Sequence, residues 1–276
     1  MDYYKTQFSH TLDEVKTDLF IYALGEIGFE SFEEEPQTLR AYIPKTLYDK
    51  AKLEALMCEW VAENIQYQTQ FIKDENWNAV WESQYEPVLF GNYCFVHAPF
   101  HAPRKDVKYN IEIEPKMSFG TAHHPTTALI IEYISKEPLQ GKRLLDMGCG
   151  TGVLAILASK EGASSVDAID NDVWAYENTL ENIERNHTPT IHVEMGDASN
   201  LQAKEYDYII ANINRNILLR DITHYAACLP TGGILLLSGF YQEDIAKLEV
   251  ECNKHRLFYV DYKTREKWAA LKFIKK

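Results

Sequence analysis

The sequence predicts an α/β protein in which a mostly parallel, seven-stranded sheet follows a smaller α+β domain. From residue 125 onward, segments with helical periodicity alternate with short, nearly continuous apolar runs, which is typical of parallel strands covered by helices on both faces. The first 75 residues instead read in the order β-α-β-β-α-β, which suggests a ferredoxin-like sandwich. A chain of 276 residues, 46% of them hydrophobic, is long enough for two such domains, and its composition rules out wholesale disorder.

The predicted first domain, residues 1–75, begins with an alternating strand, YYKTQF, followed by a helix. A capping box from Thr11 to Glu14 predicts the start of this helix, which continues to about Leu24. FESFEEE and TLRAYIP read as strands, an apolar stripe predicts a helix over 46–63, and IQYQTQFI alternates as the last strand.

A connector, residues 76–105, follows the first domain. It contains two tryptophans (Trp77 and Trp81), many other aromatic residues and three prolines, so it is too apolar for a free linker. We expect a short helix and strands here, packed between the domains.

The second domain, residues 106–276, carries the alternating pattern. Helices are predicted at 125–136, 152–161, 172–186, 215–228 and 241–255. Strands are predicted at 107–115, 143–147, 165–170, 190–195, 206–212, 233–239, 257–265 and 267–276. The last two strands follow each other without a helix between them, which predicts an antiparallel pair at the end of the sheet.

Charge and cysteine usage narrow the possible functions. With 28 basic and 41 acidic residues, the chain has a net charge of -13 and lacks the basic surface of a protein that coats DNA. An acidic surface favours basic partners, although it also serves solubility. The five cysteines form no CxxC pair, and the histidines show no ligand spacing, so we expect neither disulfides nor a metal site. Without a visible signal peptide or an apolar stretch long enough to span a membrane, we expect a cytoplasmic protein.

A glycine-rich turn follows the first predicted strand of the large sheet and opens a helix. Gly148, Gly150 and Gly152 would let a ligand approach bare backbone at a helix N-terminus. The GxGxG spacing differs from the GxGxxG of dinucleotide sites. Asp146, two residues before the first glycine, would repel a pyrophosphate but attract a cation such as a sulfonium with its α-ammonium. The alternative is a glycine turn without a ligand.

Three further polar residues follow the next strands. Asp170 lies 18 residues past Gly152, close to the position at which an acidic side chain binds ribose hydroxyls. Asp197 could accept a hydrogen bond from an adenine amine or could equally cap a helix. Asn212, at the end of the fourth strand, could accept a hydrogen bond from an incoming amine, or could be a turn asparagine.

Together with an upstream segment, these features resemble a known family. FGTAHHPTT (119–127), DMGCGTG (146–152), AID (168–170) and ANI (211–213) occur in the order seen in the bacterial ribosomal protein L11 methyltransferases, which are class I S-adenosylmethionine-dependent enzymes. The likeness covers nearly the whole chain, because NWNAVW (76–81) is similar to the family's DWxxxW stretch.

The resemblance implies a Rossmann-like methyltransferase domain, S-adenosyl-L-methionine as cofactor, and cofactor contacts from Thr127, Gly148, Asp170 and Asn212. It also implies that the N-terminal domain recognises ribosomal protein L11, free or on the ribosome, and swings about the connector. Two positions depart from the family. Ala122 stands where a second glycine is usual, and Asn214 to Asn216 replace a short apolar stretch.

The expected reaction transfers methyl groups to lysine side chains and N-terminal amines, and the enzyme contributes mainly proximity and orientation. The amine must be unprotonated, which at pH 7 costs roughly 4–5 kcal/mol for a lysine and about 1 kcal/mol for an α-amine. Asn212 and His124 are the candidate catalytic residues. His123 and His124 could relay a proton or could shape the loop over the cofactor, and Pro125 suits a first helical position.

Other functions stay open on the sequence alone. The chain could methylate an amine of another protein or of a nucleic acid, although its acidity argues against direct nucleic-acid binding. A nicotinamide-dependent dehydrogenase would conflict with Asp146 and the GxGxG spacing. A ribosome-binding factor that only senses the cofactor is a non-enzymatic alternative. Nothing in the sequence requires a dimer, so we expect a monomer.

Overall fold

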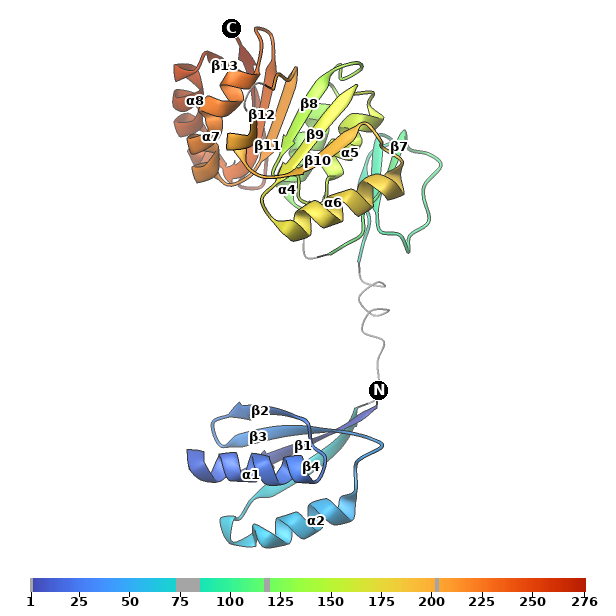
Figure 1. Ribbon diagram of the computed structural model, residues 1–276, viewed down its shortest axis with the longest axis vertical. Coiled ribbons are helices and arrows are strands. Elements are labelled where there is room, and N and C mark those ends of the chain that lie inside the picture. The colour runs from blue at the N-terminus through green and yellow to red at the C-terminus, as the bar shows by residue number, and fades with distance from the viewer. Residues whose placement is uncertain (1, 73–84, 117–119, 202–203) are drawn as a thin grey trace. The chain divides into compact units, whose positions relative to one another are not determined.

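The computed structural model describes residues 2–72, 85–116, 120–201 and 204–276. They divide into two compact units, Met1–Gln84 and Tyr85–Lys276 (Figure 1). The boundary falls inside the predicted connector of residues 76–105, whose tryptophans Trp77 and Trp81 lie outside the described residues.

The first unit has the predicted ferredoxin-like topology. Its strands are β1 (Tyr3–Ser9), β2 (Ser31–Glu35), β3 (Thr38–Pro44) and β4 (Gln66–Ile72), and its helices are α1 (Glu14–Glu26), α2 (Lys50–Glu59) and the short 3₁₀ helix η1 (Val61–Glu63). The sheet order is β2-β3-β1-β4, and every neighbouring pair is antiparallel. Phe8, Phe20 and Leu53 are fully buried between the helices and the sheet.

The ends of both helices in this unit differ from the prediction. Asp13, not Thr11, caps α1, because its side chain accepts a hydrogen bond from the backbone N–H of Lys16. Asp49 likewise caps α2, which therefore starts four residues later than expected. Leu47 lies before that cap and is 55% exposed, so it is not part of the buried stripe.

The second unit opens with a three-stranded sheet formed by β5 (Val88–Phe90), β6 (Cys94–His97) and β7 (Tyr109–Glu112). β5 and β6 are antiparallel, whereas β6 and β7 are parallel. The strands expected at the end of the connector and near residue 110 are therefore present, the latter shorter than predicted.

The large sheet has seven strands, as the fold class predicted, and their order is β10-β9-β8-β11-β12-β14-β13. Its strands are β8 (Arg143–Met147), β9 (Ser165–Asp170), β10 (Ile191–Met195), β11 (Tyr208–Asn212), β12 (Ile234–Tyr241), β13 (Leu257–Arg265) and β14 (Trp268–Lys275). The helices are α4 (Pro125–Ile134), α5 (Val153–Lys160), α6 (Val173–Asn186), α7 (Arg215–Cys228) and α8 (Ile245–Lys254), with the 3₁₀ helices η2 (Ala198–Leu201) and η3 (Gln242–Asp244). The first five strands are parallel, and β14 is antiparallel to both β12 and β13.

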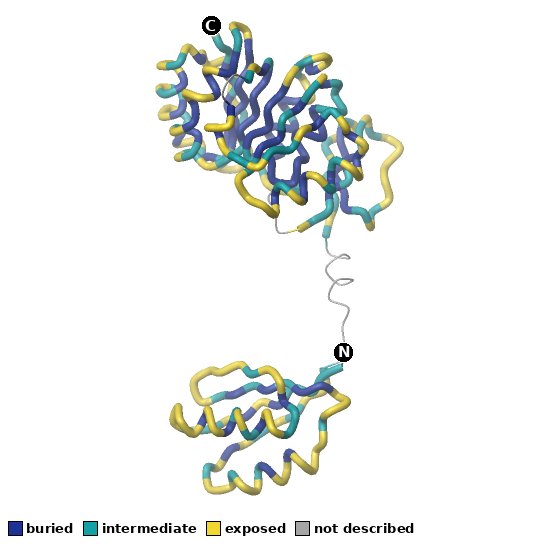
Figure 2. Tube along the Cα trace, in the orientation of Figure 1, coloured by how far each residue is buried: buried dark blue, intermediate teal, exposed yellow. Residues whose placement is uncertain are grey.

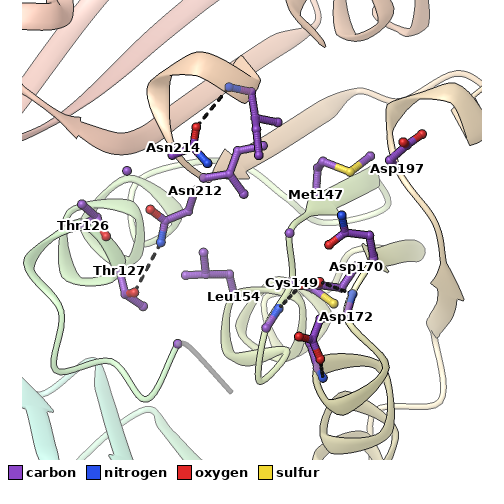
Figure 3. A pocket seen from close by; sticks show the side chains of 18 of the residues that line it. Thr126, Thr127, Met147, Cys149, Leu154, Asp170, Asp172, Asp197, Asn212 and Asn214 are labelled. Carbon is purple, nitrogen blue, oxygen red and sulfur yellow. Dashed lines mark hydrogen bonds between the residues drawn. The ribbon is translucent and has the colours of Figure 1, made fainter. Parts of the chain in front are cut away.

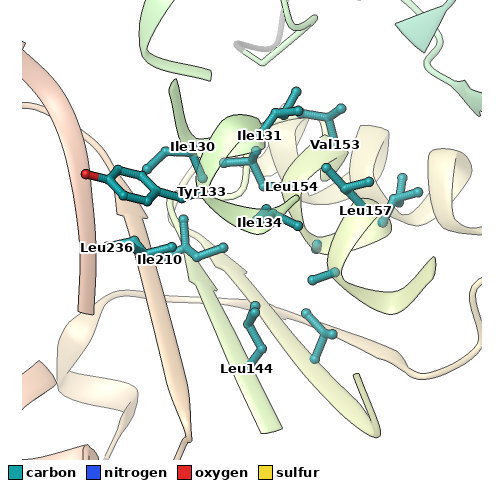
Figure 4. Close-up of a cluster of buried hydrophobic side chains, with 14 of the residues drawn as sticks. Ile130, Ile131, Tyr133, Ile134, Leu144, Val153, Leu154, Leu157, Ile210 and Leu236 are labelled. Atoms are coloured by element: carbon teal, nitrogen blue, oxygen red, sulfur yellow. The ribbon is translucent and has the colours of Figure 1, made fainter. Parts of the chain in front are cut away.

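Helices cover both faces of this sheet. Leu144, Ile210 and Leu236 point into a cluster with α4 and α5 (Figure 4). Their neighbours along the strands, among them Leu145 and Leu235, point into a second cluster with α7 and α8. This alternation buries the central strands on both sides, as the dark trace in Figure 2 shows, and explains why they read as continuous apolar runs.

The chain reverses its direction across the sheet at β8. The connections from β8 run first to β9 and β10 on one side, and then to β11 and β12 on the other. A crevice forms beyond the carboxyl ends of the strands at such a switch point. No helix within the described residues is long and apolar enough to cross a membrane.

Candidate functional site

A cavity of about 590 Å³ lies at this switch point. Its walls come from the carboxyl ends of β8, β9, β10 and β11 and from the start of α4. In Figure 3, Thr126, Thr127 and Asn212 lie on one side of the cavity and Asp170, Asp172 and Asp197 on the other, with Leu154 between them. The elements that follow the strands thus bring residues from distant parts of the chain to one site.

The glycine turn between β8 and α5 is held tightly against its neighbours. Gly148 and Gly152 both have a positive φ, of 72° and 77°. A Cβ atom at Gly148 would lie 2.2 Å from the Cγ2 of Ile213. Gly148 and Gly150 line the cavity, whereas Gly152 caps α5 behind them.

The backbone donors of this turn are largely used by the protein itself. The N–H groups of Gly148 and Cys149 donate to the carbonyl of Ile169, at 2.8 and 3.2 Å, and the N–H of Gly150 donates to Asp170. These three N–H groups are therefore not free to bind a ligand. The turn instead offers a surface without side chains.

Asp146 lies beneath the turn rather than in the cavity wall. Its side chain is only 1% exposed, and Oδ2 accepts a hydrogen bond from the N–H of Ala155 at 3.1 Å. The other oxygen, Oδ1, is buried and has no hydrogen-bond partner among the described residues. Burial, above all, raises the pKa of this carboxyl to about 7, and the nearby Asp170 charge adds to the effect. Asp146 is therefore not among the residues that line the cavity.

Asp170 holds the turn and the start of α6 together. One carboxylate oxygen accepts a hydrogen bond from the N–H of Gly150 at 2.9 Å, and the other accepts one from the N–H of Asp172 at 3.0 Å. Each oxygen keeps a free lone pair, and the side chain faces the cavity. Asp170 can therefore accept hydrogen bonds from two hydroxyl groups of a ligand.

Asp197 has the capping role that its position suggested, and it also lines the cavity. It begins η2, where its Oδ1 accepts hydrogen bonds from the N–H and the hydroxyl of Ser199, at 2.9 and 2.6 Å. These bonds lower the pKa of its carboxyl. Because it lines the cavity as well, the capping role does not prevent a contact with a ligand.

Asn212 and Thr127 meet on the opposite wall. The Nδ2 of Asn212 donates to the Oγ1 of Thr127 at 3.4 Å, and the hydroxyl-bearing side chain of Thr127 is 2% exposed. The side-chain oxygen of Asn212, Oδ1, is buried and has no hydrogen-bond partner among the described residues. An unpaired buried acceptor is costly, so this atom is suited to a donor that a ligand supplies.

The two histidines of the upstream segment have different surroundings. His124 lines the cavity and caps α4, where its Nδ1 accepts a hydrogen bond from the N–H of Thr126 at 3.3 Å. Burial lowers the pKa of His124. His123 is not part of the wall, because its ring contacts the carbonyl of Glu86 at 2.7 Å and the hydroxyl of Thr121 at 3.0 Å.

The sequence analysis missed several residues of the cavity wall. Trp268, at the start of β14, packs edge-on against the ring of His124, with 4.6 Å between the ring centroids. Trp174, on the first turn of α6, also lines the cavity and is 67% exposed. Arg220 and the buried Asp221, joined by two hydrogen bonds, contribute from α7. Within the described residues, no group of three histidine, cysteine or acidic side chains is arranged to hold a metal ion.

Comparisons with known proteins point to one family. A family model described as ribosomal protein L11 methyltransferase (PrmA) matches residues 12–276. The chain is 43% identical over 279 residues to the ribosomal protein L11 methyltransferase of Bacteroides fragilis, covering 99% of this chain and 100% of that protein. It is 45% identical over 278 residues to the enzyme of the same name from Porphyromonas gingivalis, covering 98% and 96%. Among solved structures, a ribosomal protein L11 methylase from Lactobacillus delbrueckii subsp. bulgaricus matches with 25% identity and a TM-score of 0.65, over 70% of this chain and 100% of that one.

Proposed function

The chain belongs to the ribosomal protein L11 methyltransferase family, and from this premise we propose that it methylates lysine side chains and the N-terminal amine of L11. S-adenosyl-L-methionine is the methyl donor. The observation that supports an amine as the acceptor of the methyl group is the buried side-chain oxygen of Asn212. This oxygen receives no hydrogen bond from the described residues. The reaction would take place in the cytoplasm, where ribosomal proteins are made.

The cavity residues fit such a donor. Asp170 offers two carboxylate oxygens for the vicinal ribose hydroxyls, and Asp197 offers an acceptor for the adenine amine. The turn at Gly148 would present backbone to the methionine part, and the buried Asp146 beneath it would supply a carboxyl for the positive charges. Thr127 lies in the first turn of α4, from where its hydroxyl can reach the methionine carboxylate.

When bound, the donor would supply a methyl group activated by a positively charged sulfur; the sulfur keeps the electron pair of the broken sulfur–carbon bond, and the amine lone pair forms the nitrogen–carbon bond. The protein orients the amine for an in-line approach. The side-chain carbonyl of Asn212 accepts a hydrogen bond from an N–H of the substrate amine, so that the lone pair of the amine nitrogen points at the methyl carbon. Thr127 fixes the rotation of the Asn212 amide, because it binds the Nδ2 end.

His124 serves this reaction as a wall residue. A backbone N–H donates to its Nδ1, so in the neutral ring the proton is on Nε2. That tautomer cannot accept a proton at Nε2, and the lowered pKa keeps the ring neutral at pH 7. The bonding therefore argues against a proton relay through His124, and the amine proton would leave to solvent before the transfer.

We assign substrate recognition to the predicted domain of residues 1–75, which lies within the first unit. Its strand β2 presents the exposed acidic residues Glu33, Glu34 and Glu35. Arg40 forms ion pairs with Glu33 and Glu35, at 3.6 and 2.6 Å, while Glu34 has no ion-pair partner among the described residues and is available to a basic partner.

The experiment is incubation of the purified protein with S-adenosylmethionine carrying a labelled methyl group and with purified L11. We expect mass spectrometry to place methyl groups on lysine residues and on the N-terminus. Acetylation of the N-terminus of L11 should remove only the α-amine product. Absence of label from L11 would refute the proposal, and label on ribosomal RNA in a parallel incubation would support a nucleic-acid methyltransferase.

A further inference from the structure

Helix α6 carries three buried asparagines that the proposed mechanism does not use. Asn178, Asn182 and Asn186 are four residues apart, and their exposures are 0%, 0% and 6%. None of them lines the cavity. Buried carboxamides are costly unless they are hydrogen-bonded, so their bonding partners indicate what they do.

The three side chains bind the backbone of the chain that runs alongside α6 from the end of β7. Asn186 accepts from the N–H of Glu112 at 3.0 Å and donates to its carbonyl at 2.6 Å. Asn182 accepts from the N–H of Glu114 at 2.9 Å, and Asn178 donates to the Glu114 carbonyl at 3.3 Å. The spacing fits because four helical residues rise about 6 Å and two extended residues about 6.6 Å. The helix thus pairs with the extended chain as a neighbouring strand would.

Asn182 differs from Asn186 in one contact. The Nδ2 of Asn182 donates to the carbonyl of Thr151 at 2.9 Å, in the glycine turn beside the cavity. Asn186 instead donates to the carbonyl of Asn182 in its own helix, at 2.8 Å. One carboxamide, that of Asn182, therefore joins the glycine turn to the extended chain at Glu114.

Thr151 continues this connection to the other wall of the cavity. Its side chain is fully buried, and its hydroxyl donates to the carbonyl of Gly120 at 2.7 Å. Gly120 lines the cavity and lies four residues before His124, the cap of α4. The bonds Asn182 to Thr151 and Thr151 to Gly120 run from α6 through the glycine turn to the chain that leads into α4.

We propose that Asn182 is a positioning residue that sets the glycine turn at Thr151 against the chain leading into α4, and so fixes the width of the cavity between its two walls. The inference rests on the proposed function, since it takes the cavity to be the S-adenosylmethionine site. Loss of the Nδ2 donor leaves the Thr151 carbonyl without its partner and frees the turn. The effect is on binding of the donor rather than on folding alone.

The test compares Asn182→Asp with the matched control Asn186→Asp. Each variant keeps an acceptor oxygen for a backbone N–H and replaces an amide donor, at equivalent positions of the same helix. We expect both to lower the melting temperature. Calorimetry should show a rise of at least tenfold in the Kd for S-adenosylmethionine for Asn182→Asp, and less than twofold for Asn186→Asp. Equal changes in Kd for the two variants, or none for Asn182→Asp, would overturn the proposal.

A second pair of variants covers the case in which Asn182→Asp does not fold. Thr151→Val removes the hydroxyl that binds Gly120, whereas Thr151→Ser retains it. We expect Thr151→Val to weaken binding of the donor and Thr151→Ser to restore it, and equal Kd values for the two would contradict the connection. Binding by the unaltered protein separates the two claims. If it binds no S-adenosylmethionine, the proposed function fails, whereas a failure confined to the variants concerns Asn182 alone.

Discussion

The side chains of Asn212 and Thr127, 85 residues apart in the sequence, meet at the cavity through a hydrogen bond of 3.4 Å. The bond uses the amide nitrogen of Asn212, so the amide oxygen is the end left for a ligand. That oxygen is buried and lacks a partner among the described residues. This pairing fixes which end of the amide an incoming amine meets.

Asn212→Ala should therefore slow methyl transfer more than it weakens binding of the donor. Removing one hydrogen bond to the amine costs about 1–3 kcal/mol, or roughly a 5- to 150-fold loss in kcat. The measurement is steady-state kinetics with L11, together with the Kd for S-adenosylmethionine. Asn216→Ala is the matched control, because Asn216 is exposed in the first turn of α7, close to Asn212 in the chain, and does not line the cavity. A kcat that is unchanged in Asn212→Ala would exclude the orienting role.

Asp170→Ala should weaken donor binding for two reasons. The ribose hydroxyls lose their acceptor, and the N–H of Gly150 loses the bond that holds the glycine turn. We expect a cost of about 1–3 kcal/mol in binding free energy, measured by calorimetry. Asp13→Ala controls for general loss of stability, since Asp13 caps α1 in the other unit and its loss costs about 1 kcal/mol. An unchanged affinity would remove Asp170 from the site.

The succession of helices and strands along the chain and the position of the glycine turn could be predicted because they depend on local patterns. Apolar runs mark strands buried on both faces, and glycines at 148 and 152 mark a turn with positive φ. Contacts made by the tertiary fold could not be predicted in this way. Trp268 reaches the cavity only because β14 returns beside β12, and no local pattern indicates this.

The role of Asp146 and the asparagines of α6 illustrate the same limit. The sequence places Asp146 at a strand end, but only the packing of α5 shows that its carboxyl is covered and bonded to Ala155. The spacing of Asn178, Asn182 and Asn186 was visible in the sequence as polar residues on one helical stripe. Such a stripe is ordinarily a solvated face, and only the position of the chain beyond β7 shows that it is buried.

Asp146→Asn should stabilise the protein, without ligand, increasingly as the pH rises from about 4 to 7. The folded-state pKa of Asp146 is about 7, above its unfolded value of about 3.9. The protonated carboxyl therefore contributes fully to the free energy of unfolding below pH 4, and this contribution is lost as the pH rises through 7. The asparagine carries no charge and keeps an oxygen for the N–H of Ala155. Urea unfolding at pH 4.5, 6 and 7.5 measures the difference. A difference that does not change with pH would mean that Asp146 titrates normally.

The same titration should appear in donor binding. S-adenosylmethionine carries a sulfonium and an ammonium, which favour the ionised form of a nearby carboxyl. We expect the affinity of the unaltered protein to increase from pH 5.5 to 7.5 and that of Asp146→Asn to change much less. Calorimetry at several pH values tests this, and parallel profiles for the two proteins would separate Asp146 from the cofactor charge.

Ala122→Gly tests the departure from the family in the segment before α4. Ala122 has a φ of 68°, a conformation that costs a residue with a Cβ about 1–2 kcal/mol, and it is 1% exposed. Glycine removes this strain. It also removes a buried methyl group, which costs about 0.8 kcal/mol, and the greater entropy of the unfolded chain with glycine costs a similar amount of stability.

The opposing effects should leave the free energy of unfolding of Ala122→Gly within about 1 kcal/mol of the unaltered protein. Ala158→Gly, at a fully buried position inside α5, loses its methyl group and helix propensity with no strain to relieve, so it should be destabilised by about 2 kcal/mol. Urea denaturation of both variants measures the contrast. Equal destabilisation would show that Ala122 is not strained, and that this chain replaces the family's glycine without an energetic cost.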